Sequence, residues 1–312
     1  MQYTKKFSWM MLCVLIGIFL LSACTGKIDN GFAPVTSGSS SSRVINVVAA
    51  ENFYGNVVKQ LGGSHVHVIS ILSDPNVDPH EYTSNVRTAL EVSMANLVIE
   101  NGSGYDDWMN KLLSASPNPQ RILLTGYTLA TTRLPENEHV WYSISNMTPI
   151  AQGITNALKK LDPTDASIFT HNLTVFEQSL QPLQQKINTI SAKYHGTPIA
   201  LTETIYLYQT TPEGLDVLTP FAFMKANAEG TDPPVDSVVA INNEINQRQA
   251  KVLIYNVQTV TPITTNVRNE AKQQHIPIVA VSETMPPGKT YQSWMMDQLN
   301  ALETALQQGT GK

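Results

Sequence analysis

Short apolar runs alternate along the chain with segments whose apolar residues recur at every third or fourth position. Residues 44–48 form such a run, as expected of a buried strand. In the next segment Phe53, Val57 and Leu61 recur at helical spacing before two glycines end the pattern. The alternation continues with strands predicted at 65–69, 96–100 and 121–124 and helices at 88–94 and 105–113. Because strands separated by crossover helices pair in parallel, this part predicts an α/β lobe.

The middle of the chain lacks this alternation and is helical throughout. One helix is predicted at 149–161. Asp162 is then typical of an N-cap, because a proline follows it at the first helical position. Apolar residues keep helical spacing as far as Tyr194, and Pro182 should kink the helix. This span is long for a globular helix, and we expect it to join two lobes.

After residue 197 the alternation returns, so a second lobe follows the long helix. Strands are predicted at 198–201, 251–255 and 276–281, and helices at 235–248, 261–273 and 291–306. The expected fold is α/β, with two lobes of mainly parallel sheets joined by one long linking helix. The expected boundaries are an N-terminal lobe at 43–161, the linking helix at 162–196 and a C-terminal lobe at 197–312.

The first 42 residues differ in composition from both lobes. Two lysines precede an uncharged stretch at 9–21, which is shorter than the about 20 residues that span a bilayer. The segment Leu21-Ser22-Ala23-Cys24 resembles a bacterial lipobox, in which Cys24 is lipidated and the signal peptide 1–23 is removed. An ordinary cleaved signal with an incidental cysteine is the alternative. Residues 24–42, rich in serine and glycine, predict a flexible tether. The expected location is therefore the extracytoplasmic face of the cell membrane, held by the lipid anchor.

Charge and cysteine content narrow the possible partners. The formal charge is −5 and no basic run is interleaved with aromatic residues, so nucleic acid is not expected as a partner. The two cysteines, Cys13 and Cys24, both lie in the N-terminal segment. The lobes therefore contain neither a disulfide nor a thiolate ligand, and any metal site in them must use nitrogen and oxygen atoms.

Four residues near predicted strand ends are candidate metal ligands: His80, His139, Glu203 and Glu283. In open α/β sheets ligands bind at the carboxyl ends of the strands, so the four could surround one ion between the lobes. Each has an alternative interpretation. Glu203 could favour a helix dipole, His139 could be a core histidine, and Glu283 could be a solvated turn residue. The other histidines, including His65 and His67 on one predicted strand, are assigned no ligand role.

Several motifs bear a family resemblance that covers the chain from Val44 to Leu306. They are "DPHEY" and "ANLVIENG" within 78–102, "HVW" at 139–141, "LTETIYLY" at 201–208 and "IVAVSETMPPG" at 278–288. Together they resemble the metal-specific solute-binding lipoproteins of ABC importers for zinc and manganese. The resemblance implies the long linking helix. It also implies that His80, His139, Glu203 and Glu283 are the ligands.

The chain departs from that family's pattern at several positions. Trp-Tyr-Ser-Ile replaces the usual Trp-Leu-Asp-Pro at 141–144, and Glu283 replaces the usual aspartate. The usual Ala-Phe-Gly is absent after Glu203, and residues 114–138 contain no histidine, so the His-rich loop of many zinc members is missing. A glutamate at 203 is typical of many manganese members, whereas many zinc members have a histidine. Glu203 and the missing His-rich loop favour manganese over zinc as cargo, although zinc should bind more tightly in vitro.

The expected function is capture of one divalent transition-metal ion, manganese or zinc, and its delivery to an ABC-importer permease by a monomer that is not an enzyme. One alternative is a metal-dependent hydrolase, whose metal keeps a position open for water; four protein ligands would close it. The chain also lacks H-E-x-x-H and G-x-S-x-G motifs. The other alternative is a surface adhesin, or a binder of another solute, on the same fold.

Overall fold

A four-stranded parallel sheet forms the centre of the N-terminal lobe. The computed structural model describes residues 44–75, 77 and 82–312. The strands are β1 (Ile45–Glu51), β2 (Val66–Leu72), β3 (Leu97–Glu100) and β4 (Ile122–Thr125), in the order β2-β1-β3-β4. This confirms the strands expected from the apolar runs. The signal peptide, Cys24, the tether and His80 lie outside the described residues.

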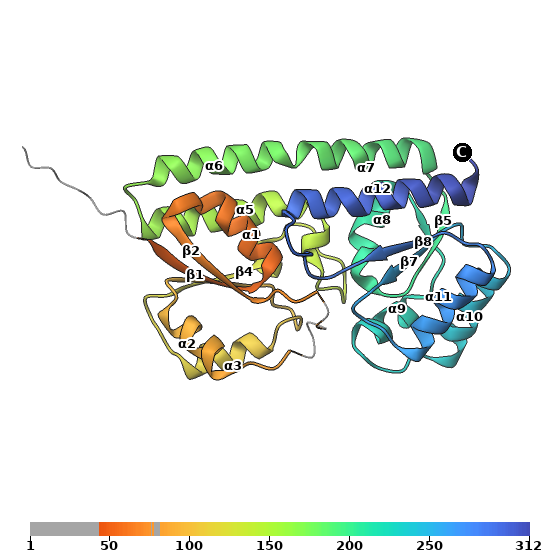
Figure 1. The fold of residues 1–312 in the computed structure, drawn as a ribbon, viewed down its shortest axis with the longest axis horizontal. Coiled ribbons are helices and arrows are strands. Elements are labelled where there is room, and N and C mark those ends of the chain that lie inside the picture. Colours follow the sequence, from red (N-terminus) through yellow and green to blue (C-terminus); the bar gives the residue numbers. More distant parts are fainter. Residues whose placement is uncertain (1–43, 76, 78–81) are drawn as a thin grey trace, which may run out of the picture. The chain divides into compact units, whose positions relative to one another are not determined.

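Helices cover both faces of this sheet (Figure 1). They are α1 (Asn52–Gly62), α2 (Val86–Met94), α3 (Trp108–Ala115), α4 (Gly126–Leu129) and α5 (Ile144–Leu161). Alternate side chains of β1 explain the two layers, because successive residues of a strand point to opposite faces. Val47 and Ala49 pack into the core shared with α1 and α5, whereas Val48 and Ala50 pack against α2 and α3.

The C-terminal lobe repeats the architecture with a second parallel sheet. Its strands are β5 (Pro198–Leu201), β6 (Asp216–Val217), β7 (Leu253–Asn256) and β8 (Ile278–Val281), in the order β6-β5-β7-β8. The helices are α8 (Leu207–Glu213), α9 (Phe221–Ala228), α10 (Val235–Asn246), α11 (Pro262–Gln273) and α12 (Tyr291–Thr310). Helices α9, α10 and α11 share one core with the sheet, and α12 packs on its other side. The two-residue strand β6 is too short to leave an apolar pattern, and sequence did not predict it.

The linking helix is divided into α6 (Ala166–Ser179) and α7 (Gln181–Tyr194), which run in line above both lobes (Figure 1). Only Leu180 separates them, and its backbone keeps right-handed helical angles. The division lies beside Pro182, as the missing proline N–H predicts. Helix α6 packs on α1 and α5, and α7 packs on α8 and α12, so the pair connects the lobes as expected.

Two predicted helix starts in this region are wrong. Asp162 does not begin the linking helix; its N–H bonds to Leu158, so it ends α5, and the next helix begins at Ala166. Helix α5 begins at Ile144 rather than at Pro149, which lies inside it. Burial of Ile144 and the other apolar residues of its first turns outweighs the single backbone bond that the proline removes.

Both lobes belong to one compact unit that extends to Lys312. Asn52 exchanges two hydrogen bonds with the backbone of Met285, and the Tyr291 hydroxyl donates to the carbonyl of Trp141.

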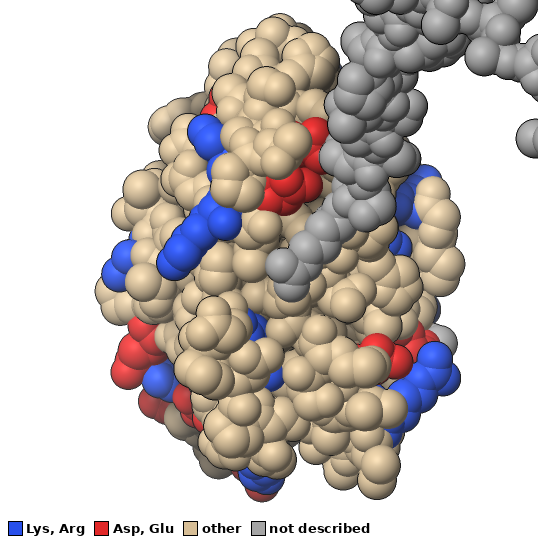
Figure 2. Space-filling view, turned by 90° about the vertical axis from the view of Figure 1, so that its left-hand side faces the viewer, with Lys and Arg blue, Asp and Glu red and all other residues tan. Residues whose placement is uncertain are grey.

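Charged side chains of both signs are sparse on the end of the N-terminal lobe that Figure 2 shows. In the part of the chain that the structure describes, no helix is both long and apolar enough to cross a membrane.

Candidate metal centre

Three of the four candidate ligands converge in one buried cluster between the lobes. His139, Glu203 and Glu283 each offer one ligand atom, and these atoms all lie within 4.8 Å of one another. The residues are almost inaccessible to solvent, with exposed fractions of 0%, 2% and 0%. We call these three residues the interlobe cluster. His80, the fourth candidate, lies outside the described residues.

Glu203 follows β5 by two residues and also begins the 3-10 helix η4 (Thr204–Tyr206). Its Oε1 accepts hydrogen bonds from the Ile205 N–H at 3.1 Å and the Thr204 hydroxyl at 3.0 Å. The helix-start role considered from the sequence is therefore real, and it is compatible with a ligand role. The cap fixes the direction of the carboxylate, whose Oε1 lies 3.6 Å from His139 Nε2.

Asn256, the last residue of β7, connects the two carboxylates. Its Nδ2 donates to Glu203 Oε2 and to Glu283 Oε1, each at 2.8 Å. Its own Oδ1 accepts the Gln258 N–H at 3.0 Å, which fixes the orientation of the amide. Glu283 follows β8, and its Oε2 accepts a hydrogen bond from the Tyr105 hydroxyl at 3.0 Å. Both lobes thus orient the carboxylates, Asn256 from one and Tyr105 from the other.

His139 lies at the end of the loop before the 3-10 helix η3 (Val140–Tyr142), rather than directly after a strand. Its Nδ1 is 2.9 Å from Asn137 Oδ1, an oxygen that can only accept a hydrogen bond. An Nδ1–H donated to Asn137 places the lone pair on Nε2, the atom that faces Glu203. Metal-binding histidines are oriented in this way by a partner on the other ring nitrogen.

Burial controls the charge state of the cluster. It raises the pKa of Glu203 to about 8, and the neighbouring charge of Glu283 adds to the effect. Burial also raises the pKa of Tyr105 well above its ordinary value, followed in size by the charge of Glu283, so the hydroxyl stays a neutral donor. A divalent cation would relieve both the desolvation and the repulsion of the two carboxylates.

A second acidic pair shapes the loop that carries Tyr105. Asp106 accepts the N–H groups of Asn101 at 2.6 Å and Gly102 at 2.7 Å. Burial and then the charge of Asp106 raise the pKa of Glu51 well above its ordinary value, and burial also raises the pKa of Asp106, so the site disfavours charge on both acids at once. Asp106 thereby holds the loop 101–106 in place beside the interlobe cluster.

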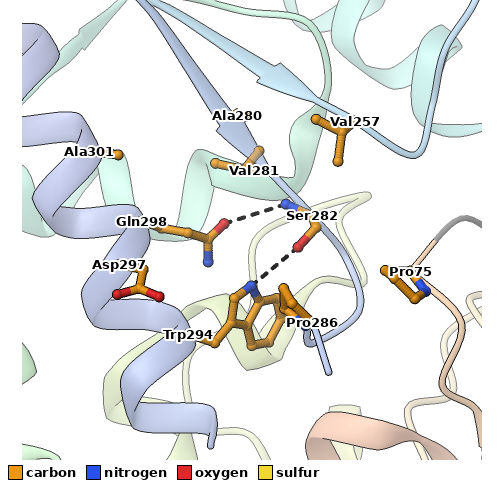
Figure 3. Close-up of a pocket in the computed structure, with 10 residues that line it drawn as sticks. All are labelled: Pro75, Val257, Ala280, Val281, Ser282, Pro286, Trp294, Asp297, Gln298 and Ala301. Atoms are coloured by element: carbon orange, nitrogen blue, oxygen red, sulfur yellow. Dashed lines mark hydrogen bonds between the residues drawn. The ribbon is translucent and has the colours of Figure 1, made fainter. Parts of the chain in front are cut away.

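Gln258 links Glu283 to the loop on which His80 was expected. Its Oε1 accepts the Glu283 N–H at 2.7 Å, and its Nε2 donates to the Val77 carbonyl at 2.9 Å. A cavity of about 440 Å³ lies on the same side, between the Pro75 loop and α12 (Figure 3). In its wall Ser282 accepts from Trp294 Nε1 at 3.2 Å, which holds the backbone beside Glu283.

Four polar residues that orient the candidate ligands were not predicted from the sequence: Asn137, Tyr105, Thr204 and Asn256. Asn256 had the same signal as the carboxylates, a polar residue at the end of an apolar run. Tyr105 was assigned to the start of a helix, but α3 begins at Trp108. Asn137 and Thr204 have no signal beyond their nearness to His139 and Glu203.

Two parallel-sheet lobes, one helical link and a buried nitrogen-and-carboxylate cluster between the lobes define the class of the protein. It is a two-lobe solute-binding protein with its candidate site at the strand ends. The chain belongs to the family described as zinc-uptake complex component A, periplasmic, whose model matches residues 47–305. This confirms the family resemblance seen in the motifs.

Individual relatives have low sequence identity to this chain but align with most of its length. The manganese ABC transporter substrate-binding lipoprotein PsaA of Streptococcus pneumoniae is 24% identical over 97% of this chain and 99% of its own. The manganese-binding lipoprotein MntA of Halalkalibacterium halodurans is 24% identical over 74% of this chain and 76% of its own. The periplasmic zinc-binding protein TroA from Treponema pallidum superposes with a TM-score of 0.70 at 18% identity, over 83% of this chain and 98% of its own. That structural likeness establishes the two-lobe fold with its connecting helix.

Proposed function

We propose that the protein captures one divalent transition-metal ion, manganese or zinc, with His80, His139, Glu203 and Glu283. It then delivers the ion to the permease of an ABC importer. The observation that carries the proposal is the convergence of His139, Glu203 and Glu283 in one buried cluster fed by both lobes. One imidazole and two carboxylates are a ligand set that both ions accept. Relatives named as metal-binding or substrate-binding lipoproteins, rather than as enzymes, support the binding role.

The metal content of the purified full-length protein tests the ligands. Wild type should copurify with, or take up, one tightly bound ion, and Glu203→Gln and His80→Ala should each lose it. His171→Ala is the matched control, because His171 is exposed on α6 and far along the chain from the cluster. Stoichiometric, tightly held metal in both ligand variants would show that the assignment is wrong.

Manganese is the proposed cargo. Glu203 stands where many zinc members have a histidine, and both PsaA and MntA are named for manganese. Zinc affinity in vitro does not test this, because zinc binds more tightly than manganese to almost any nitrogen and oxygen site. Uptake by cells with and without the protein, each ion being supplied at limiting concentration, is decisive. Loss of zinc uptake alone would make zinc the cargo and leave the ligands unchanged.

The anchor is proposed from the lipobox at 21–24 and from relatives named lipoproteins. In this proposal a monomer is tethered through Cys24 at the extracytoplasmic face, within reach of the permease. Mass spectrometry of the mature protein should find a lipid-modified Cys24 at the N-terminus, and Cys24→Ala should release the protein or block processing. An unmodified Cys24 in membrane fractions would contradict the anchor.

A further inference from the structure

A second group of possible ligands lies at the opposite end of the N-terminal sheet. His65, Asp162 and Asp165 each offer one ligand atom, and these atoms all lie within 4.8 Å of one another. His65 ends the 3-10 helix η1 (Gly63–His65) and directly precedes β2, whereas Asp162 and Asp165 bracket the turn between α5 and α6. We call this group the helix-turn cluster. Sequence analysis placed His65 on a strand and assigned it no ligand role.

The helix-turn cluster is separate from the interlobe cluster. His65 lies at the amino end of β2, and the parallel strands point from there toward the interlobe cluster. The strand has seven residues, each about 3.3 Å long, so the helix-turn cluster and the interlobe cluster are roughly 20 Å apart. Figure 2 shows this end of the lobe, where acidic and basic side chains lie beside each other toward the top of the view.

Ordinary hydrogen bonding does not account for the contacts in the cluster. His65 Nδ1 lies 2.9 Å from Asp165 Oδ2. The nitrogen is inaccessible to solvent, yet no hydrogen bond of acceptable geometry satisfies it. The imidazole nitrogen and the carboxylate oxygen are thus close together without pointing at each other along an N–H bond. That arrangement suits a nitrogen and an oxygen that both bind one metal ion lying between them.

The negative charge of the cluster also lacks a basic partner. Within the described ranges, no lysine or arginine forms an ion pair with Asp162 or Asp165; the single ion-pair contact is with His65. Asp162 is buried, with an exposed fraction of 8%, and one of its oxygens accepts the Thr164 N–H at 3.1 Å. Asp162 offers one ligand atom to the group, and the side chains of His65 and Asp165 are 15% and 21% exposed.

We propose that His65, Asp162 and Asp165 form a second, weaker site for a divalent transition-metal ion at the turn that begins the linking helix. One nitrogen with two carboxylates suits zinc, manganese, cobalt or nickel better than calcium or magnesium, which prefer oxygen alone. Ligand atoms about 2.1 Å from a tetrahedral zinc are roughly 3.4 Å apart. Side-chain rotations that move the three ligand atoms by about 1 Å would therefore complete the site. Water fills the remaining positions.

The ion would connect three segments that are held together otherwise by packing. Phe169 of α6 packs edge-on against the His65 ring at 5.7 Å, and Asn172 donates to the carbonyl of Leu61 at 2.9 Å. A bound ion adds a link between the amino edge of the sheet and the first turn of α6. It is a stabilising ion, distinct from the cargo and not passed to a permease.

Equilibrium dialysis of the full-length protein against Zn²⁺, followed by elemental analysis, tests the proposal. Wild type should bind two ions at saturation, the second at least tenfold more weakly than the first. His65→Gln and Asp165→Asn should bind one ion, with the tight site unchanged. His67→Gln is the matched control, since His67 is exposed on β2 and should leave both ions bound. Glu203→Gln should lose the tight ion and keep the weak one, which separates this proposal from the proposed function.

Melting curves in chelator must first show that each variant is folded as stably as wild type. Zn²⁺ at concentrations that fill only the weak site should then raise the melting temperature of Glu203→Gln. It should not raise that of a Glu203→Gln, His65→Gln double variant. Saturation of wild type at one ion would overturn the proposal and leave the His65–Asp165 contact as an ion pair. A second ion that persists in His65→Gln would also overturn it, because that ion would be bound elsewhere.

Discussion

Replacing Asn256 by alanine should weaken metal binding although Asn256 is not a proposed ligand. Its amide holds Glu203 and Glu283 through two hydrogen bonds of 2.8 Å, in a site closed to water. Without the amide, the carboxylates lose the orientation that brings them toward His139. The pKa of Glu203, which the Asn256 hydrogen bond lowers, should also rise, so that a proton competes more strongly with the ion at pH 7. Both effects act in the same direction.

Loss of a partner that orients metal ligands costs about 10- to 100-fold in affinity, or about 1.4 to 2.8 kcal/mol. The measurement is competition with a fluorescent chelator at pH 7, repeated at pH 9, where the part of the affinity loss that comes from proton competition should shrink. Asn246→Ala is the matched control, because Asn246 ends α10 and bonds only to Glu270 at the surface. A folded Asn256→Ala protein with an affinity within threefold of wild type at both pH values would refute the reasoning.

Three further predictions concern single buried groups. Tyr105→Phe removes the hydroxyl that donates to Glu283. The lost hydrogen bond is worth about 1 kcal/mol, so metal affinity should fall by about fivefold. Chelator competition would detect this loss, and an affinity equal to that of wild type would contradict the prediction. Because the pKa of Glu203 is about 8 without metal, affinity should rise by up to about tenfold per pH unit from pH 6 to 8 and level off above, and a flat titration would count against this. Burial also raises the pKa of Glu213 from 4.5 to about 8, so the unfolded chain loses this proton first and stability should fall as pH rises between those values, by about 1.4 kcal/mol per unit at most. Glu213→Gln, which keeps an acceptor for Tyr206, should remove that loss, and denaturant unfolding at pH 5 and pH 8 would show the difference between the two proteins growing with pH.

The two carboxylates of the interlobe cluster could be predicted as candidates because they follow apolar runs. Glu203 and Glu283 come just after β5 and β8, and the carboxyl ends of parallel strands meet at one edge. Asn256 has the same position, but an amide after a strand is also typical of an ordinary turn. Its function depends on contacts across 53 and 27 residues of chain, which no local pattern records.

The long helix shows a similar division between local and distant causes. Pro182 indicated where the helix is interrupted, because a missing N–H acts on the residues beside it. Asp162 was misassigned because an aspartate before a proline starts many helices, whereas here it ends α5. Whether Asp162 starts a helix or ends one depends on the packing of α6 against α1, a contact between distant parts of the chain.

The continuous helical connection has a kinetic consequence for the ion. Bending α6 and α7 apart would break backbone hydrogen bonds, each costing about 1 kcal/mol, and would also separate Asn52 from Met285 and Tyr291 from Trp141. Tilting the two lobes apart to release an ion would therefore cost more free energy than a local movement. The contact between the described residues Val77 and Gln258 costs less to break, because it is a single hydrogen bond of 2.9 Å. In the proposed function, the residence time of the ion would then depend on how often this contact between Val77 and Gln258 breaks, and not on the lobes tilting apart.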